Sequence, residues 1–457
     1  MAHMDVVRRS MQEPEWIAVR RARLEQCIVL DRVPVSGWRI RHARQTGEGE
    51  YEFENSESEP LDHGDMIFSP DGTVFLEAEA EVPEQLAGKE IWLEMATAAE
   101  MIVKCNGRWA GGLDPNRERV PVREKGEAGE TLCFRIEGYN RSKPDDERDV
   151  KRSSLRGCRQ VFGGASLVTI DREAQAAVYD VRVLEDTMNC SFVRGEIRAY
   201  IMRCLDTALN IPGGCGEERD PFRKGIGKMR DYLQHTVFRS RETKGFAGCG
   251  RVALVAHSHL DIAYYWRRVH AVQKNARTCL IQLRLMDRYP EFTYAHTQPY
   301  TFELLETRYP DLFKEVKERV DEGRFELVGG MYVEPDCNIP TAESLVRQCV
   351  YGQLYCRSRF GRTVNNCWLP DVFGNTWILP QILKLSGMDY FVSNKMSTWN
   401  DTNRFPHNHF LWRGIDGTEV GACVPPTHFI TWNSPSQVIE NWDEFQEKET
   451  CAETLNM

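Results

Sequence analysis

Two short segments contain residue types that could bind a metal ion or attack a carbon atom. Residues 257–261 read His-Ser-His-Leu-Asp, and residues 368–374 read Trp-Leu-Pro-Asp-Val-Phe-Gly. In an extended chain, residues two apart share a face, so His259 and Asp261 can point at one metal ion. An imidazole and a carboxylate suit Zn²⁺, and a catalytic zinc ion needs three protein ligands and one open position. The spacing therefore predicts two of those ligands.

Asp371 occupies the corresponding place in the second segment, directly after another strand-like run. Pro370 disfavours a helix at this point, and Gly374 allows the loop to turn. The Asp371 carboxylate could be a metal ligand, a nucleophile or both. The alternative is a helix N-cap, but Asn375 and Thr376 lie closer to the start of the next helix.

A third candidate loop, residues 329–338, follows a strand-like run and contains two further acids, Glu334 and Asp336. Its two leading glycines permit a tight turn or the close approach of a ligand. Either acid could hold sugar hydroxyls, and either could be an ordinary charge on a solvated loop.

The segments around these loops alternate between strand and helix. The apolar run 252–256 predicts a strand buried on both faces of a parallel sheet. Alternation of this kind is typical of a parallel sheet, open or closed into a barrel, whose reactive groups gather past the strand ends. Helices are predicted at 271–289, 300–321, 343–360 and 377–386, strands at 325–328, 364–369 and 390–393, and a hairpin around Asp416 and Gly417.

The N-terminal part has a β pattern. Over residues 37–183, short apolar–polar alternations predict many strands, as in a β-sandwich. Asn106 followed by Gly107 predicts a hairpin, because a type I′ turn needs positive φ at both positions. Trp38 and Trp109 could line a sugar-binding face or belong to the core.

Helical periodicity replaces the β pattern over residues 190–241. The predicted fold class is therefore α/β, with an N-terminal β-sandwich, a helical connector and an incomplete parallel β/α barrel. The predicted domains are an N-terminal arm (1–30), the β-sandwich (31–188), the connector (189–246) and the barrel (247–457), which is truncated at its C-terminal end.

The composition excludes several classes of protein. The chain of 457 residues has 58 basic and 68 acidic side chains and a net charge of −10, which argues against a nucleic-acid-binding surface. Its 15 cysteines contain no C-x-x-C pair, so we expect reduced thiols. The sequence has no stretch of about 18 apolar residues, so it predicts no membrane span. No signal segment is visible, and we expect a cytoplasmic protein.

Several longer motifs surround the candidate residues. They are Ala-His-Ser-His-Leu-Asp (256–261), Val-Gly-Gly-Met-Tyr-Val-Glu-Pro-Asp (328–336), Glu-Ser-Leu-Val-Arg (343–347), the segment 368–374, Leu-Pro-Gln-Ile-Leu (379–383), Phe-Pro-His-Asn-His-Phe-Leu-Trp (405–412) and Gly-Ile-Asp-Gly (414–417). As a set, and in this order, they resemble glycoside hydrolase family 38, the class II α-mannosidases, and most closely its cytosolic and bacterial branch.

The resemblance implies a retaining α-mannosidase with one Zn²⁺ and an α-mannoside glycan or oligosaccharide as substrate. His259 and Asp261 match the first two metal ligands of the family. Asp371 matches the residue that is both ligand and nucleophile, which would form a covalent mannosyl-enzyme that water hydrolyses. His257 is then left with a structural role.

The resemblance also implies substrate contacts and missing parts. Phe373 would pack against the site, and Tyr264 would replace the tryptophan that commonly forms the floor under the sugar. Glu334 and Asp336 are candidates for binding sugar hydroxyls. The family takes its last zinc-binding histidine and its general acid from later sequence, so we expect this chain to be a fragment in which the acid/base is absent, with little or no activity alone.

Two other functions fit part of the sequence. In an amidohydrolase-like metal hydrolase, His257 and His259 would both bind zinc, but the later ligands of such a site are not evident. A non-catalytic carbohydrate-binding protein would need no nucleophile. Partners other than a glycan, such as nucleic acid or membrane, are not expected, and a homo-oligomer is compatible with the sequence.

Overall fold

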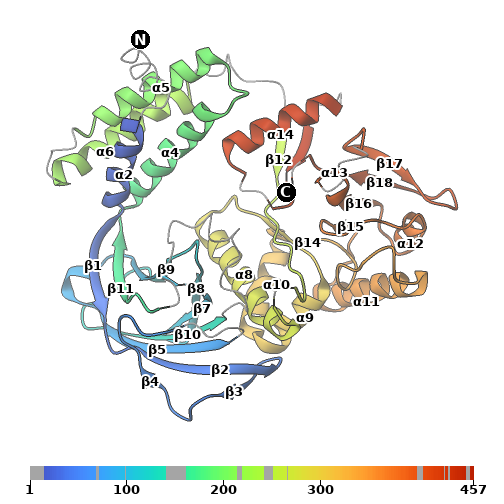
Figure 1. Cartoon of the computed structure of the whole chain (residues 1–457), viewed down its shortest axis with the longest axis horizontal. Helices are drawn as coiled ribbons and strands as arrows, with labels where there is room; N and C mark the ends of the chain where they lie inside the picture. Colours follow the sequence, from blue (N-terminus) through green and yellow to red (C-terminus); the bar gives the residue numbers. More distant parts are fainter. Residues whose placement is uncertain are drawn as a thin grey trace.

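The computed structural model describes residues 15–67, 72–97, 99–139, 161–213, 219–240, 251–264, 266–398, 405–426, 428–430, 433–448 and 453–456. It is a mixed α/β structure: antiparallel sheets and a helical group come first, and an α/β region follows from residue 251 (Figure 1). None of the helices in these segments combines the length and the apolar character that a membrane crossing requires.

The strands between residues 29 and 170 form two antiparallel sheets with one shared core. They are β1 (Val29–Val35), β2 (Arg39–Gly47), β3 (Glu50–Phe53), β4 (Glu59–Pro60), β5 (Thr73–Glu81), β6 (Ile91–Met95), β7 (Glu100–Cys105), β8 (Arg108–Leu113), β9 (Arg119–Arg123), β10 (Thr131–Tyr139) and β11 (Ala165–Ile170), with the short 3₁₀ helix η1 (Glu84–Leu86). One sheet has the order β1-β11-β6-β9, and the other β3-β2-β5-β10-β7-β8, with β4 beside β2. Leu93 of the first sheet and Phe134 of the second lie in the same buried cluster.

The predicted hairpin at Asn106 and Gly107 is confirmed. The φ angles are 47° and 77°, and the turn joins the antiparallel strands β7 and β8. Trp38 is 2% exposed and belongs to the core, so it does not line a sugar-binding face. Trp109 is half-buried, with the Lys104 ammonium 3.9 Å from its ring centroid and the Tyr309 ring against it. The Trp109 ring is therefore in contact with neighbouring side chains of the protein.

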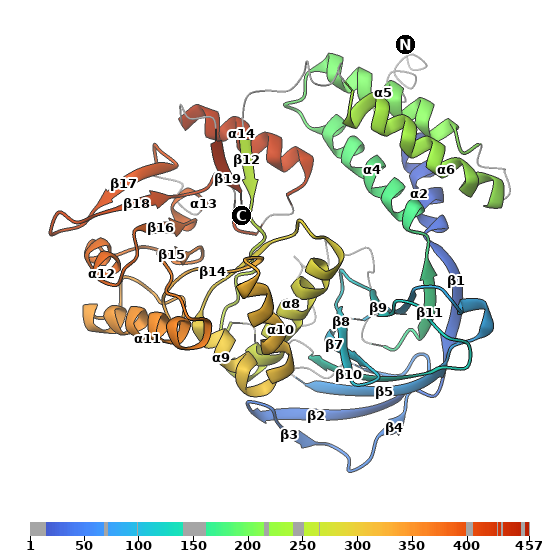
Figure 2. The same cartoon turned by 180° about the vertical axis from the view of Figure 1, so that it is seen from behind.

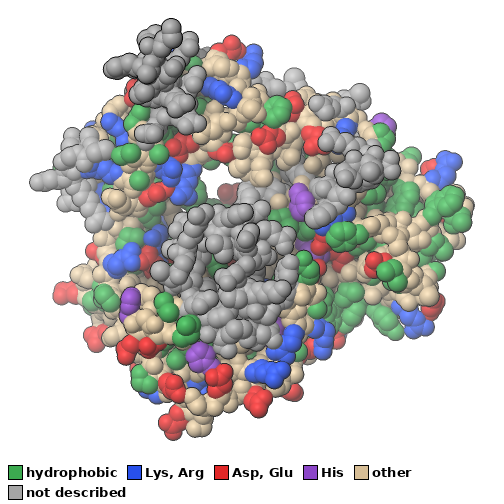
Figure 3. All heavy atoms as spheres, in the orientation of Figure 1, with side chains coloured by type: hydrophobic (Ala, Val, Ile, Leu, Met, Phe, Trp, Pro, Cys, Tyr) green, Lys and Arg blue, Asp and Glu red, His purple; other side chains and the backbone are tan. Residues whose placement is uncertain are grey.

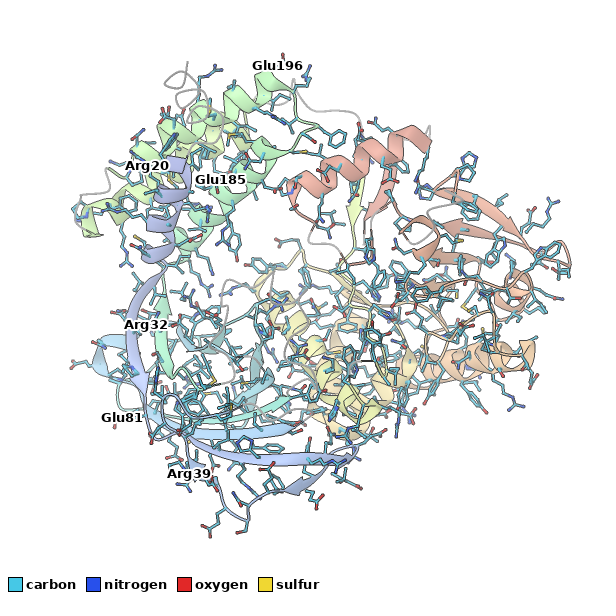
Figure 4. All side chains as sticks on the ribbon, viewed as in Figure 1. Arg20, Arg32, Arg39, Glu81, Glu185 and Glu196 are labelled. Atoms are coloured by element: carbon cyan, nitrogen blue, oxygen red, sulfur yellow. The ribbon has the colours of Figure 1, made fainter. Side chains whose placement is uncertain are left out.

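A helical group packs beside these sheets (Figure 2). It consists of α2 (Glu15–Cys27), α4 (Arg172–Asn189), α5 (Gly195–Asn210), α6 (Arg219–Leu233) and the π-helical turn η2 (Gln234–Phe238). Leu24 of α2, Val181 of α4 and Leu205 of α5 meet in one buried cluster. Arg20 and Glu185 mark α2 and α4 in Figure 4, and the Arg20 side chain donates a hydrogen bond of 2.7 Å to the carbonyl of Leu209.

One prediction about this group is wrong. The β pattern was expected to extend to Val183, but α4 begins at Arg172, because Asp171 caps it by accepting the N–H of Ala174 at 2.9 Å. The local cap at Asp171 thus outweighs the short alternating pattern of the residues that follow it. Residues 15–27, within the predicted arm (1–30), form α2, and Leu24 of this helix lies in the helical core.

The α/β region carries the candidate loops. Its elements are β12 (Arg251–Leu254), α8 (Arg268–Arg288), β13 (Tyr294–His296), α9 (Pro299–Arg308), α10 (Pro310–Asp321), β14 (Phe325–Leu327), α11 (Ala342–Phe360), β15 (Asn366–Leu369), α12 (Leu379–Leu385), β16 (Tyr390–Ser393), α13 (Lys395–Thr398), β17 (His409–Arg413), β18 (Glu419–Cys423), α14 (Pro435–Lys448) and β19 (Glu453–Asn456). β12 pairs with β19, β13 with β14, and β16 with both β15 and β18, all in parallel. The predicted hairpin at Asp416 and Gly417 is confirmed by the antiparallel pair β17–β18.

Three details differ from the predictions. β12 is not buried on both faces: its burial pattern is mostly exposed, and Leu254 is 55% exposed. An apolar run shows that a strand can be covered, but not whether neighbouring elements cover it. The single helix expected at 300–321 is two helices, because Pro310 begins α10 after a break at Tyr309. The short strand β13 was not predicted.

Exposed apolar side chains gather on one side of the α/β region, at the right of Figure 3. Val350 and Leu354 of α11 are 45% and 51% exposed, Leu385 at the end of α12 is 82% exposed, and Leu411 of β17 is 70% exposed. Contiguous apolar surface of this kind is uncommon on isolated soluble domains.

The close approach of α11 to the loop after β14 yields a test of the fold. A Cβ at Gly352 would lie 2.3 Å from the carbonyl oxygen of Gly330. Gly352→Ala should therefore destabilise the protein by about 1–3 kcal/mol, although alanine normally favours a helix. Gly227→Ala in α6 is the matched control, because its Cβ would meet only the flexible end of Glu173, at 2.9 Å. Chemical denaturation should show no decrease in the free energy of unfolding for the control. Equal behaviour of the two variants would contradict the packing described.

Candidate metal centre

The candidate site lies where four segments that follow strands meet. Residues 257–261 follow β12, residues 329–338 follow β14, Asp371 follows β15, and Lys395 begins α13 after β16. Parallel pairing of β13 with β14 and of β15 with β16 brings the carboxyl ends of these strands to the same side.

Three of the predicted residues lie together. The Nε2 atom of His259 is 3.3 Å from Asp261 Oδ1 and 3.3 Å from Asp371 Oδ2. One ligand atom from each residue lies within 4.8 Å of the others. Zinc bonds of about 2.0–2.1 Å in a tetrahedron separate neighbouring ligands by about 3.3–3.4 Å. The three side chains therefore fit a zinc-like ion, and they form a candidate metal site.

The burial of the three side chains is graded. His259 is 10% exposed, Asp371 20% and Asp261 36%. The histidine is thus the most buried member of the group, and the two carboxylates lie on the side that is more exposed to solvent. An ion held here would be reachable from solvent on the carboxylate side, as a catalytic metal must be.

Charge is concentrated at the site. Although burial opposes it, contacts with Asp261, Asp371 and Glu334 raise the pKa of His259 well above its ordinary value. Burial also works against ionisation of Asp371, but His259 and Lys395 lower its pKa. The carboxylates therefore attract positive charge to the position of the imidazole, which favours a divalent cation as well as a proton.

Sequence reasoning missed Lys395. Its ammonium group forms an ion pair with Asp371 Oδ1, and its side chain is 8% exposed. It also lies 4.5 Å from the ring centroid of Phe373 and 5.0 Å from that of Phe429. The placement rule for strand ends could have identified it, because Lys395 follows the predicted strand 390–393 by two residues.

Glu334 is not at the surface of the site. Its side chain is 5% exposed, its Oε2 lies 2.7 Å from His259 Nδ1, and its Oε1 accepts the N–H of Asp371 at 2.6 Å. Both carboxylate oxygens are thus engaged by the protein. The predicted contact with sugar hydroxyls stays a prediction.

The other predicted substrate contacts lie further out. Tyr264 and Phe373 are 63% and 70% exposed. Asp336 Oδ1 accepts the N–H groups of Asn338 and Ile339, both at 2.8 Å, and so shapes its own loop. None of these three side chains belongs to the ligand group among the described residues.

His257 lies behind the site. Its Nδ1 is 3.0 Å from the carbonyl oxygen of Ala295, its ring packs edge-on against Trp368, and burial lowers its pKa to about 4. The ligand group found among the described residues contains His259 but not His257. This arrangement matches the structural role expected for His257 and does not favour the amidohydrolase-like alternative.

The α/β region is similar to a known family. Residues 250–457 match the family model described as the N-terminal domain of glycosyl hydrolases family 38. The matched range contains all of the candidate ligands and the two predicted aromatic contacts, Tyr264 and Phe373.

Curated relatives extend the similarity. The chain is 38% identical over 190 residues to alpha-mannosidase G of Dictyostelium discoideum, covering 42% of this chain and 17% of that protein. It is 29% identical over 382 residues to human alpha-mannosidase 2C1, covering 80% of this chain and 35% of that protein. A crystal structure of an alpha-mannosidase from Enterococcus faecalis aligns with a TM-score of 0.40 and 21% identity over 46% of this chain and 24% of that chain. The chain therefore spans well under half the length of these relatives.

The geometry predicts metal binding that depends on His259. We expect His259→Ala to weaken Zn²⁺ or Co²⁺ binding more than about 100-fold, because loss of a direct ligand should exceed the 10–100-fold typical of an outer partner. Competition with a chromophoric chelator measures the affinity. His407→Ala, at an exposed position outside the group, is the control and should bind as the unchanged chain does. An equal loss of metal affinity in both variants would contradict the assignment of His259 as a metal ligand.

Proposed function

We propose that this chain is part of a zinc-dependent retaining α-mannosidase, because residues 250–457 match the N-terminal domain of glycosyl hydrolases family 38 and the curated relatives are alpha-mannosidases. Its substrates would be terminal α-mannosides of glycans or oligosaccharides. The observation that carries the proposal is the convergence of His259, Asp261 and Asp371 within a domain of this family. Three ligands and one open position are what a catalytic zinc ion requires.

Asp371 is the proposed nucleophile. A carboxylate oxygen attacks the anomeric carbon, the glycosidic C–O bond breaks, and its electron pair leaves with the oxygen, which a general acid protonates. Water then cleaves the mannosyl ester and restores the α configuration. The lowered pKa of Asp371, to which the ion pair with Lys395 contributes, supports this role, because it keeps the carboxylate ionised.

The remaining residues would bind and orient the sugar. Zinc, when bound, would hold the 2- and 3-hydroxyls and favour distortion of the ring. Tyr264 and Phe373 would supply aromatic walls, since both rings are exposed to an approaching ligand. Asp336 would be a further polar contact on its loop.

A general acid/base and a further zinc ligand are proposed to come from sequence outside this chain. Support comes from the relatives, of which the chain covers 17% and 35%. The proposed division is an N-terminal arm (1–30) that includes α2, a β-sandwich domain (31–188) that contains the two N-terminal sheets and most of α4, a connector (189–246) and part of a β/α barrel (247–457) containing the parallel pairs. A cytoplasmic location is part of the proposal, supported by free thiols at all cysteines in the described segments.

A substrate that needs no protonation tests the nucleophile separately from the acid. Fluoride leaves without a general acid, so 5-fluoro-α-mannosyl fluoride should label Asp371 of the zinc-loaded chain covalently. Peptide mass spectrometry locates the label. Asp371→Asn should give no adduct, whereas Asp416→Asn, at the exposed β17–β18 turn, should be labelled as fully as the unchanged chain.

An ordinary aryl α-mannoside provides the complementary measurement. Its leaving group gains from protonation, so the chain alone should turn it over little or not at all. Rapid, sustained turnover would contradict the proposal that the acid lies elsewhere. Sugar binding without any label at Asp371 would favour a carbohydrate-binding protein instead.

A further inference from the structure

Glu334 joins two loops that carry candidate metal ligands. One of its carboxylate oxygens, Oε2, contacts Nδ1 of His259 at 2.7 Å, and the other, Oε1, accepts the backbone N–H of Asp371 at 2.6 Å. The first partner comes from the loop after β12, and the second from the loop after β15. With 5% of its side chain exposed, Glu334 has little surface left for a substrate.

We infer that Glu334 is a positioning residue of the metal site, which sets the tautomer of His259 and the placement of Asp371, and that it does not bind the sugar. The inference rests on the proposed zinc site of the α-mannosidase. It replaces the direct contact with sugar hydroxyls that the sequence predicted for this residue.

The effect on His259 follows from the two nitrogens of its ring. A carboxylate can only accept a hydrogen bond, so the 2.7 Å approach of Glu334 Oε2 favours a hydrogen at Nδ1. The lone pair of the neutral ring is then at Nε2, the atom that lies 3.3 Å from both Asp261 Oδ1 and Asp371 Oδ2. With the other tautomer, a hydrogen would point into the place where a metal ion would bind.

Asp371 is held at three points. Its N–H is fixed by Glu334, its Oδ1 is paired with Lys395, and its Oδ2 faces His259. The backbone contact limits movement of the residue, and the lysine selects which oxygen faces the imidazole. The same carboxylate is thereby oriented for the ligand and nucleophile roles proposed above.

Glu334 is itself supported by a strained residue. Its N–H donates to Gln298 Oε1 at 3.1 Å, and Gln298 Nε2 donates to the carbonyl of Leu260 at 2.8 Å. Gln298 has a left-handed backbone, with φ of 63°, and is 4% exposed. Such a conformation costs about 1–3 kcal/mol and persists where other contacts enforce it. Gln298 thus ties the loop of Glu334 to the loop of His259.

The test is the zinc affinity of the apo chain with Glu334→Gln. To accept the Asp371 N–H, the new amide must turn its NH₂ group towards His259, which favours the wrong tautomer. We expect zinc binding 10–100-fold weaker, the range typical of outer partners of metal-bound histidines, with the melting temperature of the apo chain nearly unchanged. Glu326→Gln, an exposed glutamate on β14, is the matched control and should bind zinc normally.

A second variant keeps the inference testable if Glu334→Gln does not fold. Glu334→Asp keeps the charge but is one methylene too short to reach both partners, so it should also bind zinc more weakly. ¹⁵N NMR of His259 in the zinc-loaded chain should show the hydrogen at Nδ1, and the chemical shift of Nδ1 should change in Glu334→Gln, because its carboxylate partner is gone. Zinc affinities within twofold of the unchanged chain for both variants would overturn the inference. If the unchanged chain itself bound no zinc, the proposed function would fail instead.

Discussion

The contact between Glu334 and His259 is the interaction on which the candidate site depends. Three carboxylates, from Asp261, Glu334 and Asp371, surround one imidazole, and the ammonium of Lys395 offsets part of their charge. Like charges this close repel strongly in a partly buried place, so the arrangement is stable only with positive charge at its centre. Glu334 is the most deeply buried of the three acids, so the centre is more accessible from the side of Asp261 and Asp371.

The N-terminal sheets are connected to this site through side chains. Glu100 of β7 is 2.6 Å from the ammonium of Lys274 on α8, and both side chains are almost fully buried. The same ammonium lies 4.1 Å from the ring centroid of Trp266, whose indole N–H donates to the carbonyl of Asp261 at 3.0 Å. A buried ion pair is destabilising if either partner is lost. The first sheets therefore help to hold a candidate ligand in another region of the fold.

Much of the site could be predicted from the sequence, because strand-end placement and the family motifs are local. His259, Asp261 and Asp371 are brought together as their spacing indicated. What the sequence could not provide was the direction of each side chain. Glu334 looks from its loop like a substrate contact, but it faces inward, and Lys395 carries no motif of its own. The exposure of β12 could not be predicted from the sequence either, because it depends on residues that are distant along the chain.

The pairing of β12 has a consequence for how the protein forms. Arg251 of β12 lies opposite Glu453 of β19, roughly two hundred residues further along the chain. Contacts of such high sequence separation close large loops and slow folding. The strand that leads into His259 can acquire this neighbour only after nearly all of the α/β region has left the ribosome. The support that β19 gives to this strand therefore comes after the candidate ligands Asp261 and Asp371 have already been synthesised.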